Sequence, residues 1–193
     1  MTQALIIIDL IEEIVGQNGL SNSSYQQTKA RNVVEHANKA AMYAREKNIP
    51  LIWIKVGFAD DYHDIPAGSP MFHKAKEIGA LKLSQPGCQW ITHLNVQPDD
   101  HIFIKKGVGA FANNKLDQWL KENNIDHVIF GGVSSLMAIQ SSARQAHDLG
   151  YRVSVIDELC AAATLELHQQ SMQALQGMAT ISSLSDFLQG KIC

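Results

Sequence analysis

The chain has 193 residues, of which 46% are hydrophobic and 18% are charged, and its formal net charge is −3. A chain of this length can bury one large core, and it contains no apolar run near the roughly 20 residues that cross a bilayer. The acidic balance argues against a nucleic-acid binder, which needs a basic surface to contact phosphates. We therefore expect one soluble domain over residues 1–193, with no membrane or nucleic-acid partner.

Residue types that bind metals or form disulfides are scattered along the chain. Cys88, Cys160 and Cys193 lie far apart, which fits neither a disulfide framework nor a Cys-x-x-Cys motif. The eight histidines include no H-x-H or H-E-x-x-H pair, and the segment DDYHD followed by His73 lacks the spacing of a metal site. The start of the chain lacks the basic segment and cleavage site of a secretory signal. We expect a protein of the reducing cytosol that uses no metal and no cofactor.

The first half of the chain alternates short apolar runs with longer helical patterns. ALIIID (4–9) predicts a first strand, and Ser23 or Ser24 is placed to cap a long helix after it. The apolar stripe of this helix comprises Ala30, Val33, Ala37, Ala40, Ala41 and Ala44. LIWIKV (51–56) predicts a second strand. The segment from Gly57 to Gly87 shows little periodicity, and we expect it to be a long functional loop.

The second half continues the same alternation. Four more strands are expected at HIFIKK (101–106), HVIFGG (127–132), YRVSVID (151–157) and MATISS (178–183). Helical patterns occupy residues 113–124, 134–150, 166–177 and 183–190. Strands that alternate with helices predict an α/β fold. Specifically, we expect a Rossmann-like three-layer sandwich, in which a six-stranded, mainly parallel sheet has helices on both faces.

Three features fall at the carboxyl edge of this predicted sheet. Asp9 ends the first strand, Lys105 ends the third, and the turn from Gly131 to Ala138 follows the fourth. Open parallel sheets bind ligands at this edge. Each feature also has an ordinary explanation, because the aspartate could cap a turn, the lysine could be a solvated charge, and Ser135 could cap a helix. None of the three predicts a site alone.

Four segments together resemble, in order, the signatures of the isochorismatase-like cysteine hydrolases: ALIIIDLIEE, IFIKKGVGAF, GGVSSLMAIQSSARQAHDLGY and VIDELCAAATLELH. In the first signature Asp9 matches the family's aspartate, while Ile11 stands where glutamine is common. In the second, a K-x-x-x-S-A-F pattern, the spacing to Phe111 selects Lys105, and Gly109 replaces the serine. The resemblance spans nearly the whole chain and implies a hydrolase of small molecules.

The third signature, G-V-x-T-x-x-C-V, normally carries the nucleophile. Here Ser135 replaces the threonine and Ala138 stands at the position of the cysteine. The resemblance implies a triad in which Asp9 takes the thiol proton and Lys105 holds the pair. It also implies a non-proline cis peptide bond at Val133–Ser134, which directs backbone N–H groups toward an oxyanion.

Ala138 leaves three explanations open. In the branch that includes true isochorismatases, the aspartate protonates a vinyl ether and water adds to the resulting cation, which requires Asp9 to be an acid with a raised pKa. The chain is otherwise an engineered Cys-to-Ala form of a cysteine amidohydrolase, or a catalytically inactive relative that binds a ligand. The further departures at Ile11 and Gly109 favour the first and the third explanation over an engineered form.

The remaining expectations concern the pocket and the assembly. Trp53, Phe58 and Phe111 are candidates to line a substrate pocket, and core or subunit contacts are the alternative for them. Cys160 could be a displaced nucleophile, but a cysteine in an apolar segment more often packs in the core. Family members are commonly oligomers, which implies a homodimer or a homotetramer here.

Overall fold

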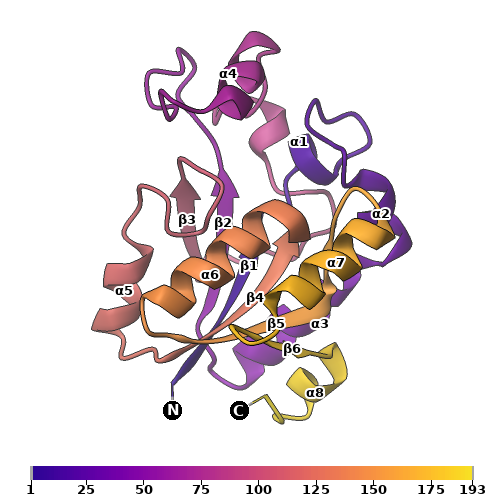
Figure 1. Ribbon diagram of the computed structural model, residues 1–193, viewed down its shortest axis with the longest axis vertical. Coiled ribbons are helices and arrows are strands. Elements are labelled where there is room, and N and C mark those ends of the chain that lie inside the picture. The colour runs from indigo at the N-terminus through magenta and orange to yellow at the C-terminus, as the bar shows by residue number, and fades with distance from the viewer. Residues whose placement is uncertain (1, 193) are drawn as a thin grey trace.

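The computed structural model describes residues 2–192 and contains one parallel sheet (Figure 1). Within these residues the sheet has six strands in the order β3-β2-β1-β4-β5-β6, and every neighbouring pair is parallel. The strands are β1 (Gln3–Ile8), β2 (Leu51–Val56), β3 (His101–Lys105), β4 (His127–Val133), β5 (Arg152–Ala161) and β6 (Thr180–Ser182). This order is that of a Rossmann-like sheet, as the sequence predicts.

Helices cover both faces of the sheet. They are α1 (Glu12–Val15), α2 (Tyr25–Ala30), α3 (Val33–Glu46), α4 (Pro70–Glu77), α5 (Leu116–Glu122), α6 (Gln140–Asp148), α7 (Leu165–Leu175) and α8 (Leu184–Leu188). One core packs α5, α6 and α7 against one face, and a second core packs α3 and α8 against the other. Within residues 2–192, no helix has the length and apolar character needed to cross a bilayer.

The central strand β1 shows why the sheet needs both layers. Ile6 and Ile8 pack into the core on the side of α6, whereas Leu5 and Ile7 pack into the core on the side of α3. Successive side chains of a strand point to opposite faces, so a strand buried on both sides has a continuous apolar sequence. The run ends at Asp9, where the chain leaves the sheet.

The long helix predicted after Ser23 or Ser24 is in fact two helices, α2 and α3. Asn32 adopts a left-handed conformation with φ of 52°, and the Ser24 side chain makes no capping hydrogen bond. The neighbouring Arg31 donates hydrogen bonds from its guanidinium group to the carbonyl oxygens of Cys160 and Asp157. The buried stripe starts at Val33 and excludes the exposed Ala30. A contact with a distant strand thus accompanies the break in the helical pattern.

The segment from Gly57 to Gly87 is only partly a loop, because it contains α4. Ser69 caps this helix by accepting a hydrogen bond from the Phe72 N–H, and Pro70 occupies the first helical position. The Ser-Pro pair is a helix-start signal that the sequence contained. Figure 1 shows α4 beyond the carboxyl end of β2, apart from the layers that cover the sheet.

Candidate active site

Asp9 and Lys105 form a buried ion pair at the carboxyl edge of the sheet. Lys105 Nζ lies 2.9 Å from Asp9 Oδ2, and both side chains are almost completely buried. The same ammonium group donates to the carbonyl oxygens of Gly107 and Val108, at 3.0 and 2.7 Å. The other carboxylate oxygen of Asp9 accepts the N–H of Val56 at 2.8 Å. Adjacent strands β1, β2 and β3 therefore hold the pair in one geometry.

Burial raises the pKa of the Asp9 carboxyl group above its ordinary value, since a carboxylate away from water loses its solvation. The charge and the hydrogen bond of Lys105 act in the opposite direction, as does the N–H of Val56. Desolvation is the largest of these effects. Asp9 can therefore hold a proton at a higher pH than an exposed aspartate.

The turn after β4 brings the third predicted feature to the same edge. Gly132 has φ of 114°, and a Cβ atom there would collide with the carbonyl oxygen of Ile8, so this position requires glycine. The peptide bond between Val133 and Ser134 is cis. A π-helical turn (Ser135–Ile139) follows and leads into α6. Ala138 lies in this turn and borders the same cavity as Asp9.

A chain of hydrogen bonds, buried at Ser135 and His168, anchors this turn on the side away from the cavity. Ser135 Oγ lies 2.7 Å from His168 Nδ1, and His168 Nε2 lies 3.0 Å from Asp157 Oδ1. Arg31 completes the chain through an ion pair with Asp157 at 2.7 Å. The hydrogen bond from His168 and the charge of Arg31 lower the pKa of Asp157 to about 2. Ser135 is fully buried, so this serine is not available to a substrate.

Sequence reasoning considered Ser135 as a helix cap and assigned no role to Asp157 or His168, although a signal was present. Asp157 and His168 both lie in the fourth family-like segment, VIDELCAAATLELH, and Ser135 lies in the third. The side chains meet because β5 and α7 both pack beside the turn. Cys160, which also belongs to that segment, lies inside β5, fully buried in the core. Burial raises the pKa of its thiol, so the structure gives Cys160 a packing role.

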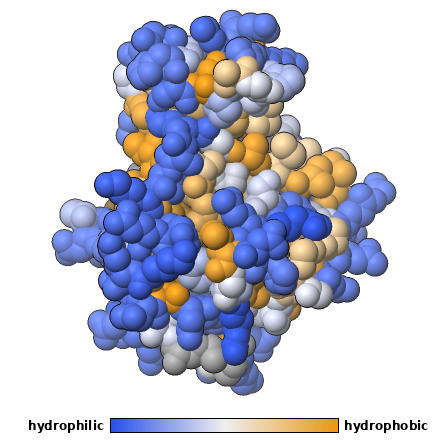
Figure 2. Space-filling model, turned by 60° about the vertical axis from the view of Figure 1, so that its left-hand side comes forward, coloured by the Kyte–Doolittle hydropathy of each residue, from blue (hydrophilic) through white to orange (hydrophobic). Residues whose placement is uncertain are grey.

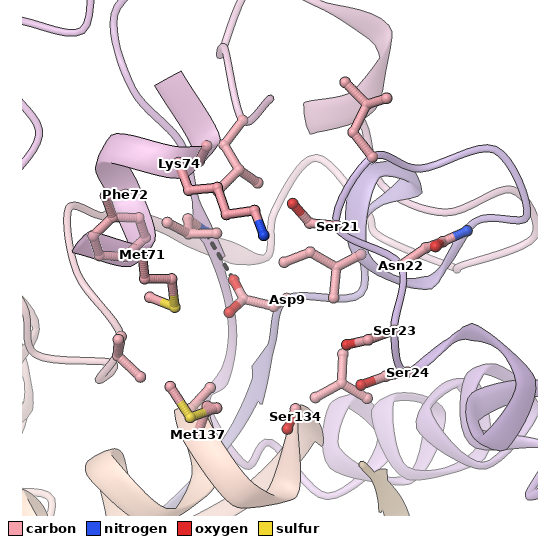
Figure 3. A pocket seen from close by; sticks show the side chains of 18 of the residues that line it. Asp9, Ser21, Asn22, Ser23, Ser24, Met71, Phe72, Lys74, Ser134 and Met137 are labelled. Carbon is pink, nitrogen blue, oxygen red and sulfur yellow. Dashed lines mark hydrogen bonds between the residues drawn. The ribbon is translucent and has the colours of Figure 1, made fainter. Parts of the chain in front are cut away.

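A cavity of about 550 Å³ opens above the ion pair and the turn (Figure 3). This volume suits a small molecule. Its apolar lining consists of Ile14, Leu20, Val56, Met71, Phe72, Ala75, Ile78, Leu81, Val108, Val133, Met137 and Ala138. Its polar lining consists of Asp9, Lys105, Lys74, Ser134 and the segment from Ser21 to Ser24. The floor comes from the sheet edge, and the walls come from α4 and from the segment before α2.

The three aromatic residues expected in the pocket lie elsewhere, and that prediction is wrong. Trp53 points to the face covered by α3, where its indole N–H donates to Asp100 at 2.8 Å. Phe58 packs under α4 against Phe72, and Phe111 stacks on Tyr151 in the core beside α6. Among the aromatic residues, Phe72 is the one that lines the cavity. The direction in which these three side chains point depends on the fold, and residue composition does not reveal it.

In the part of the chain that the structure describes, no three His, Cys, Asp or Glu side chains cluster in a way that could hold a metal ion. His73, from the predicted loop, is exposed and pairs through Nε2 with the carbonyl oxygen of Ala67. The site therefore consists of a carboxyl group, an ammonium group, backbone groups of a tight turn and an apolar cavity. Such a set can transfer a proton to or from a bound small molecule.

Comparison with known proteins identifies the family of the chain. The sequence matches the isochorismatase domain over residues 3–186. The chain belongs to the isochorismatase family. This family protein is accordingly an α/β hydrolase that acts on small molecules.

Curated relatives of this isochorismatase-family protein extend over most of its length. An uncharacterized isochorismatase family protein, YecD of Escherichia coli O157:H7, is 28% identical over 193 aligned residues, covering 97% of this chain and 95% of that protein. The ureidoacrylate amidohydrolase RutB of Cronobacter sakazakii is 27% identical over 168 residues, covering 80% of this chain and 72% of that enzyme. The relatives therefore include an enzyme with a stated amidohydrolase activity.

Solved structures share the fold of this isochorismatase-family protein. A cysteine hydrolase from Pseudomonas syringae superimposes with a TM-score of 0.86 at 18% identity, covering 97% of this chain and 91% of that one. An isochorismatase family protein from Desulfovibrio vulgaris gives a TM-score of 0.85 at 20% identity, covering 96% and 95%. At these identities the similarity supports the fold, and the prediction of a Rossmann-like sandwich is confirmed.

Proposed function

We propose that the protein hydrolyses the vinyl ether bond of a small molecule, with Asp9 as acid and base, Lys105 as its partner and water as the nucleophile. The observation that carries this proposal is the buried carboxyl group of Asp9, which faces a cavity where residue 138 is alanine. Ala138 has no atom that can attack a substrate, so a covalent route through a protein sulfur has no starting point. Proton transfer from the carboxyl group remains possible.

The first step needs an aspartic acid that keeps its proton, and the burial of Asp9 favours that form. Asp9 gives the proton to the terminal vinyl carbon, and a lone pair of the ether oxygen stabilises the oxocarbenium ion that results. Water adds to the cationic carbon and returns a proton to the Asp9 carboxylate. The hemiketal then breaks into an alcohol and a carbonyl compound, so that the bond has been hydrolysed and Asp9 is restored.

Lys105 supports this step by its charge and by its fixed position. When Asp9 has lost its proton, the ammonium group 2.9 Å away stabilises the carboxylate. The carbonyl oxygens of Gly107 and Val108 bind the remaining ammonium protons, so the group cannot turn away from Asp9. The turn at Val133–Ser134, which we also assign to the active site, forms the wall of the cavity next to Ala138.

A second candidate is a relative that binds a small molecule without converting it. The retained ion pair and the open cavity, together with Ala138 at the nucleophile position, are what favour this alternative. The name of the ureidoacrylate amidohydrolases supports a small-molecule ligand in either case.

If the natural gene encodes cysteine at position 138, the chain is instead an engineered Cys-to-Ala form of a cysteine amidohydrolase, and sequencing the gene decides this point.

The decisive experiment measures turnover of a panel of small vinyl ethers, amides and nitriles by the unchanged protein and by Asp9→Asn. We expect hydrolysis of a vinyl ether and a loss of kcat by a factor of about 100 to 10,000 in Asp9→Asn, because the amide cannot supply the proton. Asp64→Asn is a matched control, since Asp64 pairs with Lys106 outside the cavity. Binding without turnover of any compound would favour the binding relative.

The assembly and the location of the protein stay predictions. We propose that the protein forms a homodimer or homotetramer in the cytoplasm and that each subunit is a single domain. The edge strand β3 supports self-association because it exposes Ile102 and Ile104. Figure 2, which brings the side of β3 and α5 forward, shows apolar side chains gathered between hydrophilic surfaces.

A further inference from the structure

The walls of the cavity carry one positive charge that the protein does not neutralise. In the floor, the ammonium group of Lys105 has Asp9 as its partner. Lys74, on α4, also lines the cavity, and within residues 2–192 its side chain has no hydrogen bond or ion pair. Figure 3 shows its ammonium group extending from α4 into the space above Asp9. The walls therefore carry one positive charge, whichever protonation state Asp9 has in the floor.

Hydroxyl groups face this ammonium group from the segment before α2. Ser21 and Ser23 point into the cavity from the wall opposite α4 (Figure 3). Their hydroxyl groups make no hydrogen bond to the protein in residues 2–192 and can donate to a ligand. Between them, Asn22 donates to the carbonyl oxygens of Gly16 and Gln17 and so fixes the path of the segment.

Apart from a few hydroxyl and amide groups, the rest of the wall is apolar, and within residues 2–192 no lysine or arginine other than Lys74 lines it outside the floor. Met71 on α4 and Ile78 directly after this helix lie on either side of Lys74 in the sequence, and Leu20 and Met137 complete the mouth of the cavity. These four side chains are exposed in the free protein, so a ligand with an apolar body would cover them. One ammonium group balances one negative charge, which matches a carboxylate better than a doubly charged phosphate.

We propose that the cavity is selective for small monocarboxylates, with Lys74 binding the carboxylate group and Ser21 donating a hydrogen bond to it. The apolar body of the ligand lies against α4 and Met137. The inference rests on the proposed function in one respect, because it places the reacting end of a substrate at Asp9. The carboxylate end is then held at the mouth of the cavity, away from the buried ion pair.

Binding measurements test this selectivity without any need for turnover. The probes are 3-phenylpropanoate, its primary amide and 2-phenylethyl phosphate, titrated by calorimetry into the unchanged protein and into Lys74→Met. We expect Lys74→Met to weaken binding of the carboxylate by about tenfold or more, because a charge-assisted hydrogen bond is lost, and to leave binding of the amide unchanged. Methionine keeps the apolar stem of the lysine, so the wall of the cavity is preserved.

Lys76→Met is the matched control, since Lys76 lies on the same helix but does not line the cavity. It should bind all three probes as the unchanged protein does, and Lys74→Arg should keep the preference for the carboxylate. Equal carboxylate affinity in Lys74→Met and the unchanged protein would overturn the inference, as would tighter binding of the phosphate ester. Lys74-dependent carboxylate binding without vinyl ether cleavage would leave this inference standing and overturn only the proposed reaction.

Discussion

The floor and the mouth of the cavity are built in opposite ways. In the floor, Asp9 and Lys105 are almost fully buried, and each is bonded to backbone groups as well as to the other. At the mouth, Lys74 has no partner within residues 2–192, and Met71 is exposed. Rigid, satisfied groups suit the positioning of a reaction, whereas unpaired and exposed groups are free to contact a ligand. We therefore expect proton transfer to occur at the sheet edge and the choice of substrate to depend on α4.

The largest expected effect comes from breaking the ion pair in the floor. Lys105→Met should lower the free energy of unfolding at pH 7 by about 3 to 5 kcal/mol, because it leaves the Asp9 carboxylate buried without a cation. Denaturant unfolding measures this loss. Lys106→Met is the matched control, and we expect a smaller loss there because Lys106 and Asp64 are partly exposed.

The loss in Lys105→Met should depend on pH with a definite sign. Burial already raises the folded-state pKa of Asp9 above its unfolded value, and removal of Lys105 raises it further. A raised pKa favours folding below the unfolded-state pKa, and that contribution disappears as the pH rises through the folded-state pKa. The variant should therefore approach the unchanged protein in acid and fall behind as the pH increases. A loss that is the same at every pH would show that packing, and not charge, is responsible.

A smaller effect is expected from restoring sulfur beside the ion pair. In Ala138→Cys, with Cys88, Cys160 and Cys193 replaced, the new thiol should ionise below the ordinary value of about 8.5, because Lys105 and the adjoining helical turn favour its anion. The Asp9 carboxylate opposes a nearby thiolate, so the proton belongs to the whole set of groups. The rate of alkylation by iodoacetamide against pH measures the ionisation.

The alkylation rate reports whether the floor of the cavity stabilises a thiolate. An alkylation rate that rises only above about pH 8 would indicate an ordinary thiol, and the floor would then lack the electrostatics of a cysteine site. An early rise in Ala138→Cys would show that only the sulfur atom is missing.

The smallest effect on stability is expected at the mouth. Met71→Ala should change the free energy of unfolding by less than about 0.5 kcal/mol, because this side chain is exposed on α4. It should nevertheless raise KM for substrates with an apolar body and leave kcat nearly unchanged, since it removes apolar binding contacts and leaves Asp9 and Lys105 intact. A fall in kcat of the same size as that in Asp9→Asn would erase the distinction between mouth and floor.

The sequence alone predicted the sheet and the convergence of Asp9, Lys105 and the turn before Ala138. Apolar runs identify buried parallel strands, and all the strands of a parallel sheet end at one edge. Residues far apart in the sequence could therefore be placed together without coordinates. The hydrolase family was predicted from the resemblance of four segments to its signatures, and the domain match over residues 3–186 confirms that prediction.

Only the tertiary structure decided which side chains surround the site. Trp53 faces the layer of α3, whereas Lys74 enters the cavity from a helix in a segment that was expected to be a loop. The chain from Ser135 through His168 to Asp157 likewise required β5 and α7 to pack beside the turn. Local patterns predict which residues are buried, but the direction of a side chain depends on the register and packing of segments that are distant in sequence.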